Sequence, residues 1–458
     1  MEDLAAAIGV SIPVLRFLLA FLASIPCSWL WRFVPGARLR HLYSAFTGCF
    51  LSHHAFGWDA NFHFLVPILI GYISMLLFHR HCGSITFIGA FSFLICCHVY
   101  YMSGDAWKEG GMDCTGALMV LTLKVISAAI NYQDGMLKEE DLRPAQKKNR
   151  LILLPSVDEF VGYCFCCGTH LAGPVYEIQD YLDWTADKGL WSSSQKPPSP
   201  YGGALRAFLQ ALLCMGFHTY LAPRFPVSRI FEPQYTEWGF WKRWGYQWLV
   251  GFSVRWKYYF IWSISETAVI ISGLGFGGWS ESEPSKPKWN RAMNVDILGV
   301  ELAESSAVLP LVWNIHVSTW LRVYVYERVS RKGRKGGFFE LLATQIVSAV
   351  WHGLYAGYIL FFINSALMIA GSRVIYRWQQ AIPEGSWFLK KIFWAISLFY
   401  AAFELNYACI GFIVLDLRQT LQSFSSLYYA GSLIPVGLII FGTVVRPPRS
   451  VRSKAKKT

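Results

Sequence analysis

The chain has 458 residues, of which 54% are hydrophobic, 17% are aromatic and only 15% are charged, and its formal net charge is +12. A soluble domain of this size carries more charge, and here the apolar residues come in long blocks. The composition therefore excludes an ordinary soluble protein and indicates a polytopic membrane protein.

The apolar blocks predict an all-α fold with about ten or eleven transmembrane helices, several of them short or interrupted by a charge such as Lys124. The N-terminus, MEDLAAAIGV, is acidic where a cleavable signal peptide is basic, so we expect the first block to be retained. The predicted spans are residues 12–31, 64–78, 85–102, 115–130, 204–222, 246–264, 307–326, 338–354, 355–370, 392–415 and 432–445.

The polar connections between the spans are basic at 147–150 and 328–335, and the tail at 446–458 is basic too. By the positive-inside rule we expect these segments to face the cytosol. We expect residues 1–445 to form a single membrane domain and 446–458 a cytosolic tail. Lys454 and Lys456 have the spacing of a dilysine signal for retrieval to the endoplasmic reticulum, and binding of the tail to anionic lipid is an equally good interpretation.

Other features of the chain are less informative. The segments at 187–203 and 277–294 are rich in Ser, Pro and Gly and are predicted to be loops. No repeat or pair of related halves is visible, which disfavours transporters built from duplicated bundles. The eleven cysteines lie largely in apolar runs, so we expect free thiols rather than disulfides.

Polar side chains inside apolar runs are candidates for function, because they are costly in a bilayer unless they face a cavity or a partner. In QIVSAVWHGLYAGY, a helix would place Gln345, Ser348, His352 and Tyr355 on one stripe. A Gly353–Gly357 pair on a neighbouring face would allow another helix to approach closely. His352 is either a histidine satisfied in the core or an acid–base group, since imidazole titrates near neutral pH.

A second polar group lies in WNIHVSTWLRVYVYER, where Asn314, Ser318 and Arg322 recur every four residues and would share one helix face. Hydrogen bonding between helices is the ordinary role of such an amide. If this segment and the next form a hairpin, Asn314 and His352 both lie about 20 Å from the connecting loop, at matching depth.

A third group, GFSVRWKYYFIWSISE, contains Arg255, Lys257 and Glu266. Lys257 either reaches toward the headgroups as an anchor or lines a path for an anionic substrate. An imidazole, a neighbouring amide and a cationic mouth together suit acyl transfer from a thioester to an alcohol. The basic loops would then attract the phosphates of coenzyme A.

A competing motif is HAFGWD, in which His54 and Asp59 have the His-x4-Asp spacing of glycerolipid acyltransferases. With eleven histidines in the chain, about 0.3 matches of this kind are expected by chance, so the spacing alone is weak evidence.

The sequence resembles the membrane-bound O-acyltransferase family. WHGLYAGYILFF at 351–362, preceded by the segment containing Asn314, is similar to the family's signature. The segment containing Arg255, followed by GLGFGGW at 273–279, resembles the lysophospholipid acyltransferase branch, in which plant members are the most similar. YMSGDAWKEGG at 101–111 and HLAGPVYEIQDY at 170–181 agree, and the resemblance extends over about residues 10–445.

The resemblance implies a helical body with a substrate tunnel, no metal and no bound cofactor, acyl-CoA as co-substrate, and reacylation of lysophospholipids in the endoplasmic reticulum membrane. It implies that His352 is the general base and that Asn314 assists it. One departure from the family pattern is Asn290 after Trp289, where many relatives have Trp-Asp. The residues expected to line the substrate path are Arg255, Lys257, Tyr258, Tyr259, Trp262, Glu266, Ser318, Arg322, Ser348 and Tyr355.

We therefore expect an acyl-CoA-dependent enzyme that acylates the sn-2 hydroxyl of lysophosphatidylcholine, lysophosphatidylethanolamine and related lipids. Two alternatives stay open: an enzyme of the same family with a sterol, diacylglycerol or protein acceptor, and a lipid transporter or scramblase. The FYxDWWN type of motif found in sterol and diacylglycerol enzymes is missing. We expect membrane lipids but no nucleic acid as partners, and a homo-oligomer is compatible with the sequence.

Overall fold

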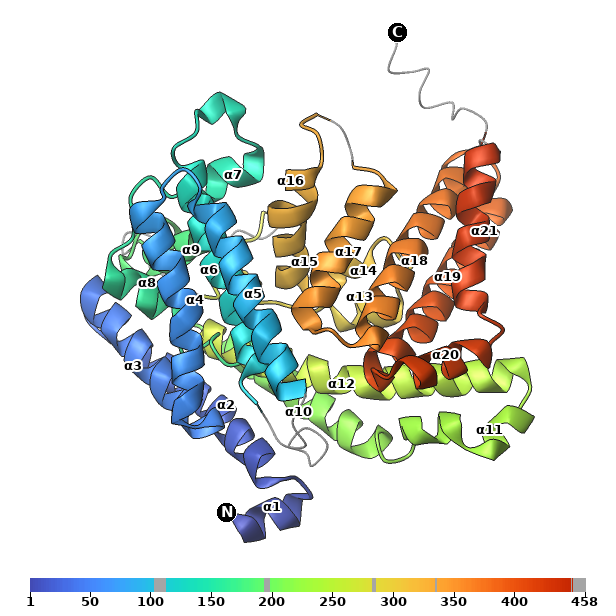
Figure 1. Ribbon diagram of the computed structural model, residues 1–458, viewed down its shortest axis with the longest axis horizontal. Helices are drawn as coiled ribbons and strands as arrows, with labels where there is room; N and C mark the ends of the chain where they lie inside the picture. The colour runs from blue at the N-terminus through green and yellow to red at the C-terminus, as the bar shows by residue number, and fades with distance from the viewer. Residues whose placement is uncertain (103–112, 193–197, 282–285, 334–335, 446, 448–458) are drawn as a thin grey trace. The chain divides into compact units, whose positions relative to one another are not determined.

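A computed structural model of the chain describes residues 1–102, 113–192, 198–281, 286–333, 336–445 and 447. Most of the phrase at 101–111, parts of the segments at 187–203, 277–294 and 328–335, and nearly all of the tail with Lys454 and Lys456 lie outside the described residues. Over the described residues the ordered elements are helices, with two isolated bridges, which confirms the all-α class (Figure 1).

The described chain folds into two compact units. One comprises residues 1–213 and 260–294, and the other comprises residues 214–259 and 295–458. Helices α10 (Tyr201–Leu221) and α12 (Phe240–Ser272) contribute residues to both units. The single membrane domain expected over residues 1–445 stays a prediction.

The first unit contains the N-terminal helices. Capping side chains mark where two of them begin: Ser11 accepts a hydrogen bond from the Val14 N–H before α2, and Ser156 and Glu159 form a capping box at the start of α8. The helices are α1 (Glu2–Ile8), α2 (Ile12–Trp31), α3 (Ala37–Phe56), α4 (Trp58–Leu77), α5 (Cys82–Met102), α6 (Thr115–Asp134), α7 (Pro144–Asn149), α8 (Val157–Cys164) and α9 (Ile178–Thr185), with short η2 (Glu139–Asp141) and η3 (Gly189–Trp191) turns.

Helix α6 lies at the centre of this unit, because 72% of its most apolar window is buried, compared with 33% for α2. Its Lys124 is fully buried and donates hydrogen bonds to the carbonyl oxygens of Tyr163 and Cys164, the latter at 3.2 Å. These carbonyls belong to the last turn of α8, where the helix dipole favours a cation. The charge that interrupts this predicted span is therefore satisfied inside the protein.

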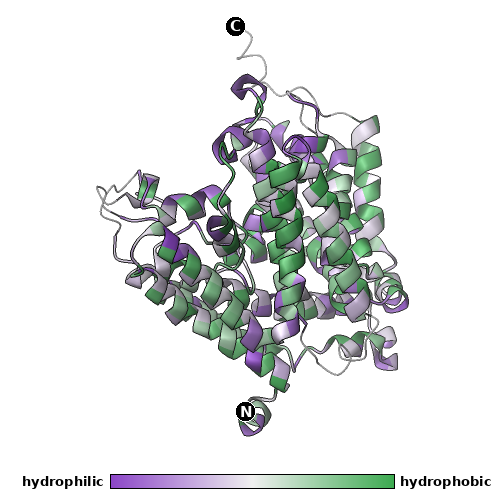
Figure 2. Ribbon diagram, turned by 60° about the vertical axis from the view of Figure 1, so that its left-hand side comes forward, coloured by the Kyte–Doolittle hydropathy of each residue, from purple (hydrophilic) through white to green (hydrophobic). Residues whose placement is uncertain are grey.

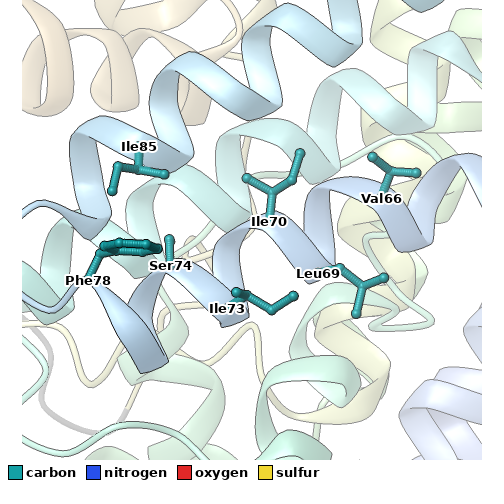
Figure 3. Close-up of a pocket in the computed structure, with 7 residues that line it drawn as sticks. All are labelled: Val66, Leu69, Ile70, Ile73, Ser74, Phe78 and Ile85. Atoms are coloured by element: carbon teal, nitrogen blue, oxygen red, sulfur yellow. The ribbon is translucent and has the colours of Figure 1, made fainter.

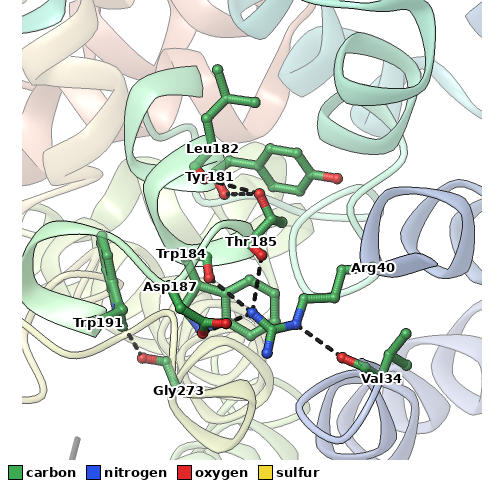
Figure 4. A network of polar contacts seen from close by, with 9 residues as sticks. All are labelled: Val34, Arg40, Tyr181, Leu182, Trp184, Thr185, Asp187, Trp191 and Gly273. Atoms are coloured by element: carbon green, nitrogen blue, oxygen red, sulfur yellow. Dashed lines mark hydrogen bonds and ion pairs between the residues drawn. The ribbon is translucent and has the colours of Figure 1, made fainter. Parts of the chain in front are cut away.

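Arg40 joins α3 to the end of α9 within the same unit (Figure 4). Its guanidinium donates to the carbonyl oxygens of Val34 at 3.0 Å, Trp184 at 3.2 Å and Thr185 at 3.0 Å, and pairs with the carboxylate of Asp187 at 2.9 Å. A cation that hydrogen-bonds the last carbonyls of a helix stabilises that end. Arg40 thus fixes the chain around α9.

The second unit contains the C-terminal helices, which follow the shared helix α12 in sequence. Gly357 allows α18 and α19 to approach closely: a Cβ atom at that position would lie 2.2 Å from the carbonyl oxygen of Gly411. The helices are α11 (Pro233–Glu237), α13 (Ile297–Glu301), α14 (Leu309–Val312), α15 (Ile315–Leu321), α16 (Glu327–Val329), α17 (Phe338–His352), α18 (Ala356–Gln380), α19 (Trp387–Val414), α20 (Leu417–Ser425) and α21 (Ala430–Val444), with η5 (Val227–Phe231) and the π-helical turn η6 (Arg322–Tyr326).

Six helices in the described part of the chain are long and apolar enough to span a membrane, namely α2, α4, α5, α6, α18 and α19, and the bent pair of α20 and α21 gives up to seven. The other predicted spans do not meet these requirements of length and apolar character. The block at 307–326 is broken, α17 has only 15 residues, and α10 and α12 are more polar. Figure 2 shows hydrophobic residues along the long helices and hydrophilic ones gathered at helix ends and loops.

All eleven cysteines are free thiols, as predicted. Seven of them are buried, three are half-buried and Cys96 is exposed, which fits the expected role of small apolar side chains.

Candidate functional site

His352 lies at the very end of α17, not inside a continuous helix. Gly353 follows with φ 127°, a backbone conformation that favours glycine, and α18 begins only at Ala356. The imidazole is half-buried among four aromatic rings. Its centroid lies 4.7 Å from Trp351, 5.5 Å from Tyr358, 5.2 Å from Phe362 and 5.1 Å from Phe412.

The break after His352 corrects two predictions about this segment. Gln345, Ser348 and His352 do share one face of α17, with Ser348 buried, but Tyr355 precedes α18 and is not part of that stripe. Gly353 and Gly357 are likewise not on one helix. Gly357 makes a close approach, since its N–H donates to the carbonyl oxygen of Leu415 at 2.9 Å.

Asn314 occupies a second break, which corrects the predicted span at 307–326. Helix α14 ends at Val312, Trp313 is extended and paired with Val295, and α15 starts at Ile315. Asn314 between them has φ 43° and ψ 54°, in the left-handed region. Asparagine is one of the few non-glycine residues that visit this region routinely, so its identity suits the break.

The prediction that Asn314, Ser318 and Arg322 share one helix face is also wrong, because Asn314 precedes helix α15. The hydroxyl of Ser318 donates to the carbonyl oxygen of Trp313 at 3.2 Å. The side chain of Arg322 is 58% exposed, begins the π-helical turn η6 and lies 3.9 Å from the carboxylate of Glu327. Ser318 therefore contacts the break at Asn314 through Trp313, whereas Arg322 points to solvent and Glu327.

A chain of aromatic contacts connects these elements within the second unit. The ring of Tyr258 on α12 lies 5.9 Å from that of Trp313 and 6.3 Å from that of Phe412, and Phe412 in turn contacts His352 at 5.1 Å. We call these four residues, Tyr258, Trp313, His352 and Phe412, the aromatic cluster. It links the end of α17, the residue before Asn314, the middle of α12 and the last turn of α19.

Arg255, which precedes Tyr258 by one helical turn on α12, forms a buried ion pair. Its Nε and Nη2 atoms donate to the two carboxylate oxygens of Glu301, at 2.7 and 2.6 Å, and its Nη1 donates to the amide oxygen of Asn406 at 2.8 Å. The hydroxyl of Tyr259 donates to the same carboxylate at 2.6 Å. Two parallel bonds between guanidinium and carboxylate are the strongest and most directional form of ion pair.

The Arg255–Glu301 pair is linked to the Asn314 break through the backbone. Glu301 ends α13, and Asp296 caps the start of the same helix by accepting from the Gly299 N–H at 3.0 Å. The Asp296 N–H donates to the carbonyl oxygen of Val312 at 2.9 Å, next to the Val295–Trp313 bridge. Thus α12 and α19 hold α13, and α13 holds the strand-like segment that ends at Asn314.

The remaining predicted residues of α12 have different surroundings. The side chain of Lys257 is exposed, and its ammonium lies 5.3 Å from the centroid of the Tyr258 ring. Trp262 and Glu266 belong to the first unit and are both buried. Glu266 forms an ion pair with Arg206 of α10. Glu266 therefore already has a protein partner for its charge.

The competing motif at the end of α3 does not form a site in the described residues. His54 lies in the last turn of α3 and Asp59 in the first turn of α4, and both residues are exposed. The ring of His54 packs against Phe50 at 4.5 Å. The position with the family departure lies elsewhere, at Asn290, whose amide packs against Gly277.

Sequence reasoning missed three participants in this arrangement: Glu301, Asn406 and Phe412. Asn406 could have been found from the sequence, because it is an amide inside the long apolar run of α19, and polar side chains in such runs are candidates for function. Glu301 and Phe412 carry no such signal, since an acidic residue between loops and a phenylalanine in a span are ordinary. Across the described residues, no group of three or more His, Cys, Asp or Glu side chains could hold a metal ion.

The chain is similar in sequence to a known protein family and to several characterised relatives. Residues 99–414 match the family model described as MBOAT, membrane-bound O-acyltransferase family. The chain is 60% identical to lysophospholipid acyltransferase 2 of Arabidopsis thaliana, covering 100% of this chain and 98% of that protein, and 60% identical to lysophospholipid acyltransferase 1 of the same plant, covering 100% and 99%. It is 28% identical to a lysophospholipid acyltransferase of Schizosaccharomyces pombe, covering 97% and 89%.

Proposed function

The chain belongs to the membrane-bound O-acyltransferase family, and we propose that it transfers a fatty acyl chain from acyl-CoA to the sn-2 hydroxyl of lysophospholipids. Membership makes it an acyltransferase and a multi-pass membrane protein. The observation that carries the proposal is the 60% identity, over the whole chain, to two relatives named for lysophospholipid acylation. Lysophosphatidylcholine and lysophosphatidylethanolamine are the proposed acceptors, in the endoplasmic reticulum membrane.

His352 is the proposed general base. Its imidazole takes the proton of the lysophospholipid hydroxyl as that oxygen attacks the thioester carbonyl carbon. When the tetrahedral intermediate collapses, the C–S bond breaks, and the imidazolium returns the proton to the departing thiolate of coenzyme A. The position of His352 at a helix end, among rings rather than lipid, supports this role because it shelters the imidazole without enclosing it in a helix interior.

Asn314 is the proposed partner of His352 in this step. Its amide N–H groups would stabilise the negative charge on the carbonyl oxygen or orient the imidazole. The left-handed backbone at Asn314 supports a functional role, since strain of this kind persists only where the surrounding structure maintains it. The link from Arg255 and Glu301 through α13 is the proposed means of maintaining it.

The other predicted residues receive supporting roles in the proposal. Lys257 is exposed and is proposed to attract the phosphates of coenzyme A, together with the basic segment at 328–335. Arg255 is assigned a positioning role because its charge is already compensated by Glu301. The proposed lining of the substrate path consists of Tyr258, Tyr259, Trp262, Glu266, Ser318, Arg322, Ser348 and Tyr355.

Two other functions would give different products. An enzyme of the same family with another acceptor would acylate a sterol, a diacylglycerol or a peptide. A scramblase or transporter would move lipid across vesicles with no acyl-CoA present. Incubating the purified protein with labelled acyl-CoA and each acceptor in turn distinguishes these cases, and analysis of the product by phospholipase A2 shows whether the chain is at sn-2.

The decisive variant is His352→Ala. We expect it to lower the rate of acyl transfer by about 10² to 10⁴, because general base catalysis contributes about that much. The matched control is His54→Ala, which removes the exposed histidine of the competing motif and should leave the rate unchanged. Loss of activity in the His54 variant and its retention in the His352 variant would reverse the assignment.

A further inference from the structure

A groove on the second unit lies apart from the aromatic cluster and shares no residue with it. Its volume is about 640 Å³, within the usual range for a site that takes one small molecule. Several rim side chains are exposed, including Trp241, Ile396 and Phe399. The groove lies between α18, α19, α21 and the start of α12, and is lined by Phe240, Trp241, Ile375, Ile392, Ala395, Ile396, Phe399, Tyr400, Phe403, Glu404, Ile434 and Leu438.

Glu404 is the exception in this apolar lining. The residue is only 1% exposed, and its Oε1 atom has no hydrogen-bond partner among the described residues. The hydroxyl of Tyr400, which also lines the groove, is already satisfied because it donates to the carbonyl oxygen of Met368 at 3.0 Å, and Trp241 is exposed at the rim. A buried polar atom left without a partner costs about 1 to 3 kcal/mol, so a ligand that supplies the missing hydrogen bond would be stabilised by it.

A second apolar groove, on the first unit, shows what such a surface looks like without this feature (Figure 3). It has a volume of about 360 Å³ and lies between α4 and α5. Its polar residue is Ser74, whose hydroxyl is hydrogen-bonded to the carbonyl oxygen of Gly71 at 2.9 Å and to the hydroxyl of Thr86 at 2.5 Å. The polar atom of this groove already has partners, whereas Oε1 of Glu404 has none among the described residues.

The shape of the groove limits the ligand. Along α19 it extends from Ile392 to Glu404, which is about 18 Å of helix, with the carboxyl group at one end. At the same end the ring of Phe240 lies 6.3 Å from that of Phe403, and the ring of Trp241 lies 6.1 Å from that of Phe399. A volume of about 640 Å³ over this length is wider than one alkyl chain needs, so the body of the ligand is broad and apolar.

The polar end of the ligand is limited by the single carboxyl group. A phospholipid headgroup brings several charged atoms, for which this lining has no partners. An amine would form a buried ion pair, and the desolvation of two charges offsets much of their attraction. A hydroxyl group needs only one partner and can act as donor to the carboxyl oxygen without a buried charge of its own.

We propose that this groove binds a sterol-class lipid, with its one hydroxyl group hydrogen-bonded to Glu404 and its fused rings against α19 and α21. The lipid is bound as a ligand and is not acylated, because His352 is not part of the lining. The proposal is independent of the proposed acceptor, and each can fail without the other.

The test uses the full-length protein in detergent with a sterol that carries a photoreactive diazirine on its ring system. We expect labelled peptides to map to α19 and α21, and labelling to weaken about tenfold in Glu404→Leu, since one hydrogen bond to a charged or buried group has about that effect. Glu404→Gln keeps a hydrogen-bonding group and should label within about threefold of the native protein. Glu384→Leu, at an exposed loop carboxylate, is the matched control and should label normally.

A 3-deoxy sterol probe separates the hydroxyl contact from apolar binding in general. Equal labelling by the deoxy probe, or unchanged labelling of Glu404→Leu, would overturn the proposal. Disulfide cross-linking between copies of an Ile396→Cys variant that sterol does not suppress would show a second copy in the groove instead. Retained melting temperature and acyl transfer in Glu404→Leu exclude misfolding as the cause of lost labelling.

Discussion

Asn314 adopts a left-handed backbone, and in the proposed function its amide has a second role, as the partner of His352. Its φ of 43° places it where most side chains clash with the backbone. Glycine adopts this backbone more easily than asparagine but has no amide. These two roles are separable by mutation.

We predict that Asn314→Gly keeps the melting temperature of the native protein but lowers the rate of acyl transfer by about 10² to 10³, as expected for loss of an oxyanion donor. Asn314→Ala should lose both activity and stability, since alanine at a positive φ costs about 1 kcal/mol or more. The measurements are steady-state rates and thermal unfolding. An Asn314→Gly variant with native activity would show that the residue serves only the backbone.

A second residue, His170, is a buried histidine whose imidazole is kept from being protonated. It is 1% exposed, it contacts the rings of Phe64 and Phe165, and neither of its nitrogens makes a hydrogen bond of normal geometry within the described residues. Burial, with the positive charge of Lys124 adding to it, lowers the pKa of His170 to about 3. The side chain is therefore neutral in the folded protein at ordinary pH.

The consequence is a pH-dependent stability. Between about pH 3 and 6.5 the unfolded chain binds a proton at His170 that the folded chain does not, so unfolding is favoured as the pH falls. The free energy of unfolding should be highest above about pH 6.5 and about 2 kcal/mol lower at pH 5 from this residue alone. His170→Phe should flatten the melting temperature between pH 7 and 5, whereas His54→Phe, at an exposed position, should follow the native profile.

At the scale of elements, two devices hold the second unit together: the Arg255–Glu301 ion pair and the glycine contact of α18 with α19. The ion pair connects α12 to α13, and Asn406 adds α19. Such a pair is costly to bury but directional, so we interpret it as a device for position more than for stability. The glycine contact instead removes side-chain atoms so that backbones can meet.

We predict that Arg255→Met destabilises the protein by about 3 to 5 kcal/mol, because it leaves the Glu301 carboxylate buried without its partner. The double variant Arg255→Met, Glu301→Met should recover most of that stability, since no charge remains buried. If the pair acts by positioning Asn314, the double variant will melt normally but turn over slowly with an unchanged KM. Full activity in a well-folded double variant would refute the positioning role.

Gly357→Ala should destabilise the contact between α18 and α19. The new Cβ would lie 2.2 Å from the carbonyl oxygen of Gly411 and 2.7 Å from the Cα of Leu415, and backbone atoms cannot move away cheaply. We expect a loss of about 1 to 3 kcal/mol, measured as a lower melting temperature. Gly437→Ala on α21 is the matched control, since nothing lies within 4 Å of its added Cβ.

At the scale of the molecule, the chain consists of two compact units, each with its own buried polar network. The first is organised around α6, whose Lys124 is satisfied by the end of α8. The second contains the aromatic cluster, the Arg255 ion pair and the groove at Glu404. The proposed catalytic residues His352 and Asn314 both belong to the second unit.

Most of the long helices were predictable, because a run of apolar residues long enough to cross a bilayer has few other stable forms. The block at 12–31 coincides with α2, and the blocks at 85–102 and 392–415 lie within or nearly within α5 and α19. Helix α3 was missed because ARLRHLYSAF is too polar for a span. Fewer helices in the described residues, six or up to seven, are long and apolar enough to span a membrane than the sequence predicts, because a broken or short helix can have the composition of a span without its length.

The sequence alone determined the membrane character, the family resemblance and the two segments that carry His352 and Asn314, since all three depend on which residues are present and in what order. Only the tertiary structure decided that both segments are broken at those residues, and that Glu301 and Asn406 complete the ion pair of Arg255. The physical reason is that periodicity assumes a continuous helix. A break at one residue, or a contact between residues 151 positions apart, depends on packing partners that no local pattern contains.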